Sequence, residues 1–214
     1  MSIKPILFNK QIGTEMVRAI LDGRKDATRR IVKGFIPDDA VWGYTAFTPK
    51  GYISCRGTFA DGYGEKFFKL PCEPGNILYV RETWKKAPNG YYYYEDWQRN
   101  DIADVTKWKP SIHMPKEAAR IWLKVTNVRV ERLQDITPKG AESEGVGNLF
   151  YDDIGYGEKN YGTEVDTEYG IAKEQFAWLW ESTIKKSDLD RYGWDANPWV
   201  WVIEFERCEK PEGV

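Results

Sequence analysis

The chain has 214 residues, of which 42% are hydrophobic and 30% are charged, as expected of a globular protein. Its formal net charge of −2 argues against a protein that coats nucleic acid by charge alone, and leaves a small ligand or a local contact with RNA open. No apolar run approaches transmembrane length and the N-terminal residues lack an apolar signal region, so we expect a cytoplasmic protein without membrane partners.

Residue types that bind metals are scarce in this chain. The 3 cysteines are odd in number and widely spaced, which indicates reduced thiols rather than a zinc finger or a disulfide framework. His113 is the single histidine, so we expect neither a metal site nor a cofactor. It lies in a proline-flanked segment, where we expect a buried, hydrogen-bonded structural residue. Unless His113 acts as the catalytic base, that base must be a Lys, Glu or Asp side chain.

The first elements along the chain are a strand and a helix. Residues 3–8 alternate in polarity as a strand does. Residues 14–22 have the period of a short amphipathic helix, with Thr14 as a residue that can cap its start and Gly23 where a helix C-cap glycine belongs.

A basic segment follows the helix. Residues 24–33 contain five basic side chains and one acid, a composition that favours a polar loop. Lys25 and Thr28 lie three residues apart, so one turn or tight loop can direct both into one pocket.

The middle of the chain consists of short strands separated by glycine and proline turns. The clearest strand is 119–133, where the alternation changes phase at Thr126 and Asn127, which indicates a β-bulge. The other expected strands are 41–47, 52–59, 65–70, the segment that follows the Pro74-Gly75-Asn76 turn, and 199–205.

Two further helices are expected, at 137–145 and 171–184. Thr137 is the N-cap of the first, and Glu144 lies near its C-terminal end. The helix dipole disfavours a carboxylate there, so Glu144 needs a compensating cation such as Lys25 or an arginine. The segment between the helices, 147–170, is rich in glycine, tyrosine and acids, and we expect a mobile insertion near the pocket that can act as a lid.

Three of these segments carry a family resemblance. Gly-x-Lys-x-x-Thr-x-Arg at 23–30, the Pro-Gly-Asn turn with its apolar strand, and Ala-x-x-Glu-Gly-hydrophobic at 141–146 resemble, in this order, the ASCH domain family. The resemblance implies an α+β protein with a PUA-like β-barrel: one domain, 1–214, with insertions at about 43–70, 86–105 and 147–170. The segments 81–84 and 108–115 resemble the phage and prophage branch of that family.

The resemblance also implies a site. In this family the position three residues after the motif lysine is often Glu, but this sequence has Thr28 there. In this respect it resembles the small bacterial amidohydrolases that remove the acyl group from N4-acetylcytidine. On this basis Lys25, Thr28 and Glu144 are catalytic. Thr28 is the nucleophile with Lys25 as its base, or it orients a water for Glu144, and the sequence leaves both versions open. The residues expected to bind substrate are Arg24, Arg29, Arg30, Trp84, Trp108 and His113.

Two other functions fit the same residues. PUA-like barrels bind RNA, so the basic segment can contact phosphate while Glu144 reads a base edge. A ribonuclease can use Lys25 and Arg30 to stabilise the phosphorane, with Glu144 moving protons. We expect the partner to be a modified nucleoside or base, or RNA; the sequence does not indicate an oligomeric state.

Overall fold

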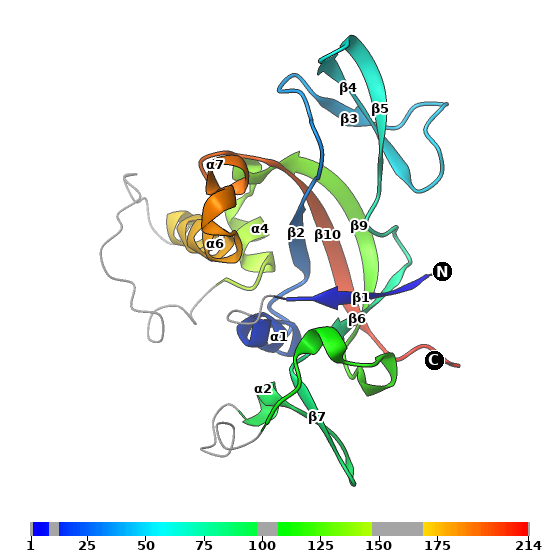
Figure 1. Cartoon of the computed structure of the whole chain (residues 1–214), viewed down its shortest axis with the longest axis vertical. Coiled ribbons are helices and arrows are strands. Elements are labelled where there is room, and N and C mark those ends of the chain that lie inside the picture. The colour runs from blue at the N-terminus through cyan, green and yellow to red at the C-terminus, as the bar shows by residue number, and fades with distance from the viewer. Residues whose placement is uncertain (1, 9–12, 98–106, 147–168, 214) are drawn as a thin grey trace.

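The computed structural model describes residues 2–8, 13–97, 107–146 and 169–213, and a five-stranded sheet is its centre (Figure 1). The strands lie in the order β1-β6-β9-β10-β2. β1 and β6 are parallel, and the other neighbours are antiparallel. These strands are β1 (Ile3–Leu7), β2 (Ala27–Ile31), β6 (Ile77–Arg81), β9 (Trp122–Arg132) and β10 (Trp199–Cys208).

The longest pairing in the sheet, between β9 and β10, contains a bulge. Asn127 pairs with Glu204 and Val125 pairs with Phe205, so Thr126 is an extra residue in β9. The bulge predicted from the change of phase is therefore confirmed. A bulge increases the local twist of a strand pair, and Figure 1 shows β9 and β10 bending along their length.

Helices pack against both faces of this sheet, α1 in one core and α4 and α6 in the other. α4 and α6 contact each other and lie beside β2, and α1 lies below them near the end of β1 (Figure 1). No described helix is long and apolar enough to cross a membrane. The α-helices are α1 (Gly13–Leu21), α2 (Tyr94–Trp97), α4 (Pro138–Ser143), α6 (Tyr169–Thr183) and α7 (Leu189–Tyr192). The 3-10 turns are η1 (Ser111–His113), η2 (Lys116–Ala118), η3 (Leu133–Asp135) and η4 (Lys186–Asp188).

The two faces of the sheet bury different cores, because side chains alternate along a strand. In β10, Trp201 and Ile203 face a core that also contains Phe8 and the side chains of α1. Val200 and Val202 face a second core, which α4 and α6 complete. Because β2 pairs with β10, each side chain of β2 lies on the same face of the sheet as the β10 residue opposite it.

Two smaller sheets project from opposite ends of the main sheet (Figure 1). One is an antiparallel sheet of β3 (Val41–Gly43), β4 (Tyr52–Phe59) and β5 (Gly62–Lys69), of which β4 and β5 lie within the proposed insertion at 43–70. The other is the hairpin of β7 (Trp84–Ala87) and β8 (Gly90–Tyr93), which lies largely in the proposed insertion at 86–105. The third proposed insertion falls almost entirely on 147–168, outside the described residues.

The expectation of a mixed α and β protein with mostly strands is confirmed, and the predicted helices occur where the sequence placed them. One prediction is wrong. Residues 27–31 of the basic segment form strand β2 within the main sheet and not a polar loop. The reason is that Lys25, Thr28 and Arg29 are each no more than 3% exposed, since partners far along the chain neutralise the two cations.

Candidate functional site

A buried ion pair between Lys25 and Glu144 is the centre of the site. The Lys25 Nζ lies 2.7 Å from Oε2 of Glu144, and the two side chains are 0% and 3% exposed. Nζ also donates to the main-chain carbonyl of Glu144 at 2.8 Å and to that of Ala27 at 2.7 Å. An ammonium group has three N–H donors, and all three are used here. These contacts are therefore those of a charged lysine.

Glycine at the end of α4 allows the close approach that this pair needs. Thr137 caps α4 by accepting a hydrogen bond from the Gly140 N–H, and Glu144 is the C-cap residue. Glu144 then forms a β-bridge with Lys25. Gly145 has a φ of +87°, and a Cβ there would lie 2.8 Å from the Cβ of Ala19. A side chain at Gly145 would thus be strained and would separate α4 from α1.

Arg29 extends the pair into a neutral cluster of four charges. Its Nη1 lies 3.2 Å from Oε1 of Glu144, and its Nη2 lies 2.7 Å from Oε1 of Glu131 in β9. The guanidinium also lies over the ring of Phe176 in α6, 5.6 Å from its centroid. The two cations and two carboxylates of this cluster balance, which is the condition for keeping such charges buried, and Glu131 also contacts the more exposed Arg129 at 3.3 Å.

The protonation of Lys25 depends on opposing effects. Burial lowers the pKa of its ammonium below the ordinary value, the neighbouring carboxylate of Glu144 raises it, and the guanidiniums of Arg30 and Arg29 lower it further. The net direction is downward, because the side chain is excluded from water. Lys25 therefore releases a proton more readily than an exposed lysine does, although the present contacts hold the proton on it.

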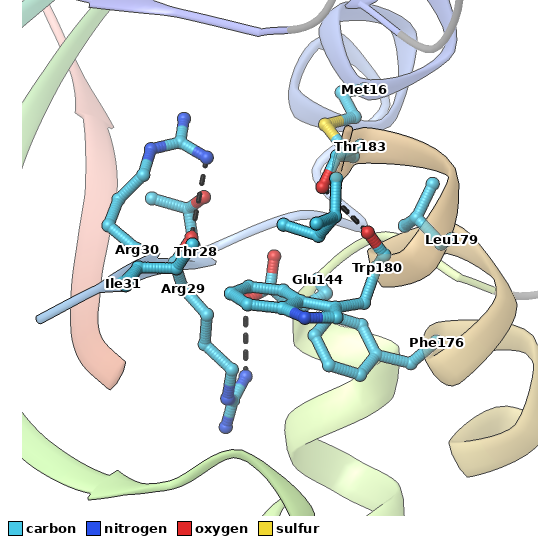
Figure 2. A pocket seen from close by; sticks show the side chains of 11 residues that line it. Met16, Thr28, Arg29, Arg30, Ile31, Glu144, Phe176, Leu179, Trp180 and Thr183 are labelled. Carbon is cyan, nitrogen blue, oxygen red and sulfur yellow. Dashed lines mark hydrogen bonds and ion pairs between the residues drawn. The ribbon is translucent and has the colours of Figure 1, made fainter. Parts of the chain in front are cut away.

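A cavity of about 360 Å³ opens beside this cluster (Figure 2). Glu144 and β2 form its polar wall, and Figure 2 shows the side chains of α6 facing them across the space. The α6 residues recur at the i, i+3, i+4, i+7 spacing of one helix face, and they are mostly apolar. The lining residues are Met16, Thr28, Arg29, Arg30, Ile31, Glu144, Phe176, Leu179, Trp180, Thr183 and Ile184.

Thr28 is buried at 1% exposure and still lines the cavity. Within the described residues its hydroxyl has no hydrogen-bond partner, so the group is available to a ligand or a water. Arg30, also in the wall, is half-buried: Nη2 donates to the Leu7 carbonyl at 2.8 Å, and the guanidinium lies 5.4 Å from the Phe8 ring centroid. The structure thus places Thr28, Arg29, Arg30 and Glu144 around one cavity. Lys25 does not line the cavity, because its side chain lies behind Glu144 and is 0% exposed.

The other predicted site residues do not line this cavity. Arg24 is bound to Asp22 and to the carbonyl of Gly145. Trp84 lies in a separate core cluster of the β7–β8 region, and Trp108 contacts the ring of Tyr94 at 5.5 Å.

His113 is exposed, so the expectation of a buried structural histidine is wrong. It lies in η1, none of whose residues is buried, whereas the residue that follows, Met114, is 0% exposed. The Pro110–Pro115 segment therefore buries the methionine against the β7–β8 cluster and leaves the imidazole in solvent.

Two contributors to the site were not anticipated from the sequence. Glu131 in β9 holds Arg29 from behind the cavity, and Trp180 in α6 forms part of the apolar wall. Trp180 donates its indole N–H to the Tyr192 carbonyl at 2.8 Å, which fixes the ring. The helical period marked the Trp180 face as buried, but a period cannot distinguish a core face from a cavity wall. Among the described residues no group of three His, Cys, Asp or Glu side chains is placed to hold a metal.

Comparison with known proteins finds a similar solved structure but no matching family model or curated protein. No family model matches the sequence, and no curated protein matches it significantly. A solved structure to which the chain is similar is the high resolution crystal structure of an ASCH domain from Lactobacillus crispatus JV V101. The match has 12% sequence identity and a TM-score of 0.42, and it covers 96% of this chain and 79% of that one. Similarity at this level transfers neither activity nor site residues.

Proposed function

We propose that the protein is an ASCH-type amidohydrolase that removes an acyl group from an N-acylated cytosine base or nucleoside. The observation that carries the proposal is that Thr28 and Glu144 line a cavity whose volume of about 360 Å³ suits a small molecule, with Lys25 bound to Glu144 behind the wall. The proposal is supported by the sequence resemblance, which names Lys25, Thr28 and Glu144.

The contacts of Lys25 favour the version in which water is the nucleophile. A lysine base for Thr28 needs a free lone pair directed at the hydroxyl, whereas all three Nζ contacts go to the oxygens of Ala27 and Glu144. Each carboxylate oxygen of Glu144 keeps a second lone pair beside its bond to Lys25 or Arg29. Glu144 then takes a proton from a water that the Thr28 hydroxyl orients.

The reaction follows from these positions. Water attacks the acyl carbon, and its proton passes to Glu144. The carbon–nitrogen bond breaks as that proton is delivered to the exocyclic amine, which leaves as cytosine. The acyl group leaves as a carboxylic acid, which gives its proton to the solvent. Arg29 and Lys25 hold the Glu144 carboxylate in place and stabilise its negative charge, so Glu144 returns readily to the ionised form once it has delivered the proton.

The alternative of RNA binding or cleavage is less well supported by the same contacts. Lys25 has no donor left for a phosphate, and Arg29 is engaged with the carboxylates of Glu131 and Glu144. A phosphate entering here would meet the carboxylate of Glu144. The cluster is therefore suited to a neutral ligand.

The test is the absorbance change on hydrolysis of N4-acetylcytosine and N4-acetylcytidine. We expect Glu144→Gln to lower kcat/KM by on the order of a hundredfold or more, the usual size of a lost general acid–base group. The matched control is Glu82→Gln, which removes a carboxylate equally buried and paired with Arg120, away from the cavity. Equal losses in both variants would mean that Glu144 acts only through stability.

Thr28 separates the two versions of the mechanism. Thr28→Val keeps the shape and removes the hydroxyl, so under water attack it slows the reaction and leaves a measurable rate. Thr28→Ser restores the hydroxyl and should restore the rate in part. An acyl adduct on Thr28 in the mass spectrum of the acid-quenched wild type would instead make the hydroxyl the nucleophile. Absence of hydrolysis of every acylated cytosine, with RNA binding retained, would overturn the proposal.

A further inference from the structure

The cavity lies along the unpaired edge of strand β2. Thr28 and Arg30 pair with Ile203 and Trp201, so their side chains share the main-core face of the sheet. Arg29 and Ile31 pair with Val202 and Val200, on the opposite face. All four β2 residues line one cavity, and a cavity that touches both faces of a strand must pass around its edge.

The backbone alternation of β2 shows which polar groups point to that edge. The N–H of Val32 donates to the Trp199 carbonyl, and the Asp26 carbonyl accepts from the Phe205 N–H. In an antiparallel pair these groups alternate, so the even-numbered residues of β2 bond to β10 and the odd-numbered ones point away. The carbonyl of Ala27, an odd-numbered residue, points away from β10 as expected. It accepts a hydrogen bond from Nζ of Lys25, which also donates to Glu144.

Two backbone donors on this edge have no partner among the described residues: the N–H of Arg29 and the N–H of Ile31. Successive residues on one edge of a strand are about 6.5 to 7 Å apart. Arg29 is buried and Ile31 is half-buried. A buried N–H without a partner is costly, so the N–H of Arg29 in particular favours a ligand or water beside this edge. Across the cavity, the aromatic side chains of Phe176 and Trp180 provide an apolar surface for a flat ring.

From this arrangement we infer that the cavity recognises a pyrimidine ring by its polar edge, with the backbone of β2 as the reader. The Arg29 N–H, next to Thr28, binds the acyl carbonyl oxygen, and the Ile31 N–H binds the ring carbonyl at the other end of an acylated cytosine. The choice of a pyrimidine rests on the proposed function. The two donors and their spacing do not, since they follow from the register of β2.

The first measurement concerns the edge itself. In the free protein, amide hydrogen exchange should be slow at Thr28 and Arg30 and faster at Arg29 and Ile31. Addition of cytosine should shift the backbone amide resonance of Ile31 more than that of Arg30. Equal protection of all four amides would mean that the edge is paired, and would overturn the inference.

The second measurement isolates one hydrogen bond. Ile31→Pro removes the outward N–H, and proline is tolerated at such a position of an edge strand. Ile31→Val is its reference, because valine has as many side-chain carbons as proline and keeps the N–H. The paired ligands, measured by calorimetry at pH 8, are cytosine and 4-aminopyrimidine, which lacks the ring carbonyl.

In Ile31→Val, cytosine should bind about tenfold more tightly than 4-aminopyrimidine, as expected for one hydrogen bond, and in Ile31→Pro the ratio should fall to within about twofold. An unchanged ratio in Ile31→Pro overturns the inference, and so does a wild type that binds neither ring. If the wild type binds cytosine with the expected ratio but hydrolyses no acylated cytosine, the proposed function fails and the recognition by β2 stands.

Discussion

Removing one charge from the Lys25–Glu144 pair should destabilise the protein strongly, and removing both should cost much less than the sum. The pair is excluded from water, with side chains 0% and 3% exposed. Lys25→Met leaves one excess negative charge in the cluster that Arg29 and Glu131 complete, and Glu144→Gln leaves one excess positive charge. The double variant leaves the neutral pair of Arg29 and Glu131.

The expected size follows from the cost of an uncompensated buried charge. Each single variant should lose about 3–5 kcal/mol of unfolding free energy. For a chain of this length that loss corresponds to a melting temperature lower by roughly 6–20 °C. Lys25→Met should be the milder of the two, because Arg29 stays 3.2 Å from Glu144 and neutralises part of the remaining charge. The double variant should recover about 2 kcal/mol or more of the summed loss.

The assay is urea unfolding of the four proteins, followed by circular dichroism, at low and at high salt. Salt should change the coupling energy little, because buried charges are poorly screened. A Lys25→Met variant within about 0.5 kcal/mol of the wild type, as for a surface residue, would refute the reasoning. Strictly additive losses would refute it as well, since they would mean that the two charges do not depend on each other.

Three further predictions concern other residues. Gly145→Ala should cost about 1–3 kcal/mol, because φ is +87° and the new Cβ meets Ala19; a melting temperature like that of the wild type would contradict this. Burial raises the pKa of Glu95 from 4.5 to about 7, so the folded state binds the proton more tightly than the unfolded state, and the unfolding free energy should fall as the pH rises through that range. Glu95→Gln should flatten this slope, and an equal slope in both proteins would refute the prediction. Burial also raises the pKa of the Cys55 and Cys72 thiols to about 11, so neither should react with a thiol reagent at pH 8 before the protein unfolds in urea; mass spectrometry would detect labelling that contradicts this.

Local patterns in the sequence were sufficient for most of the elements. The helices at 14–22 and 137–145, the cap at Thr137 and the bulge at Thr126 were predicted correctly, because each depends on residues that are neighbours in the chain. The need of Glu144 for a cation also followed locally, from its position at the end of a helix. Lys25 was named as one such partner, and the structure places it there.

The burial of the basic segment could be decided only by tertiary structure. A run of lysine and arginine resembles a solvated loop, because charged side chains are buried only when they are paired. The partners of Lys25 and Arg29 are Glu144 and Glu131, more than a hundred residues further along the chain. Only the pairing of β2 with β10 and the docking of α4 bring these carboxylates to the two cations. The sequence by itself therefore named Lys25, Thr28 and Glu144 as candidates, and the long-range contacts decided that these residues are buried and that Lys25 is neutralised by Glu144.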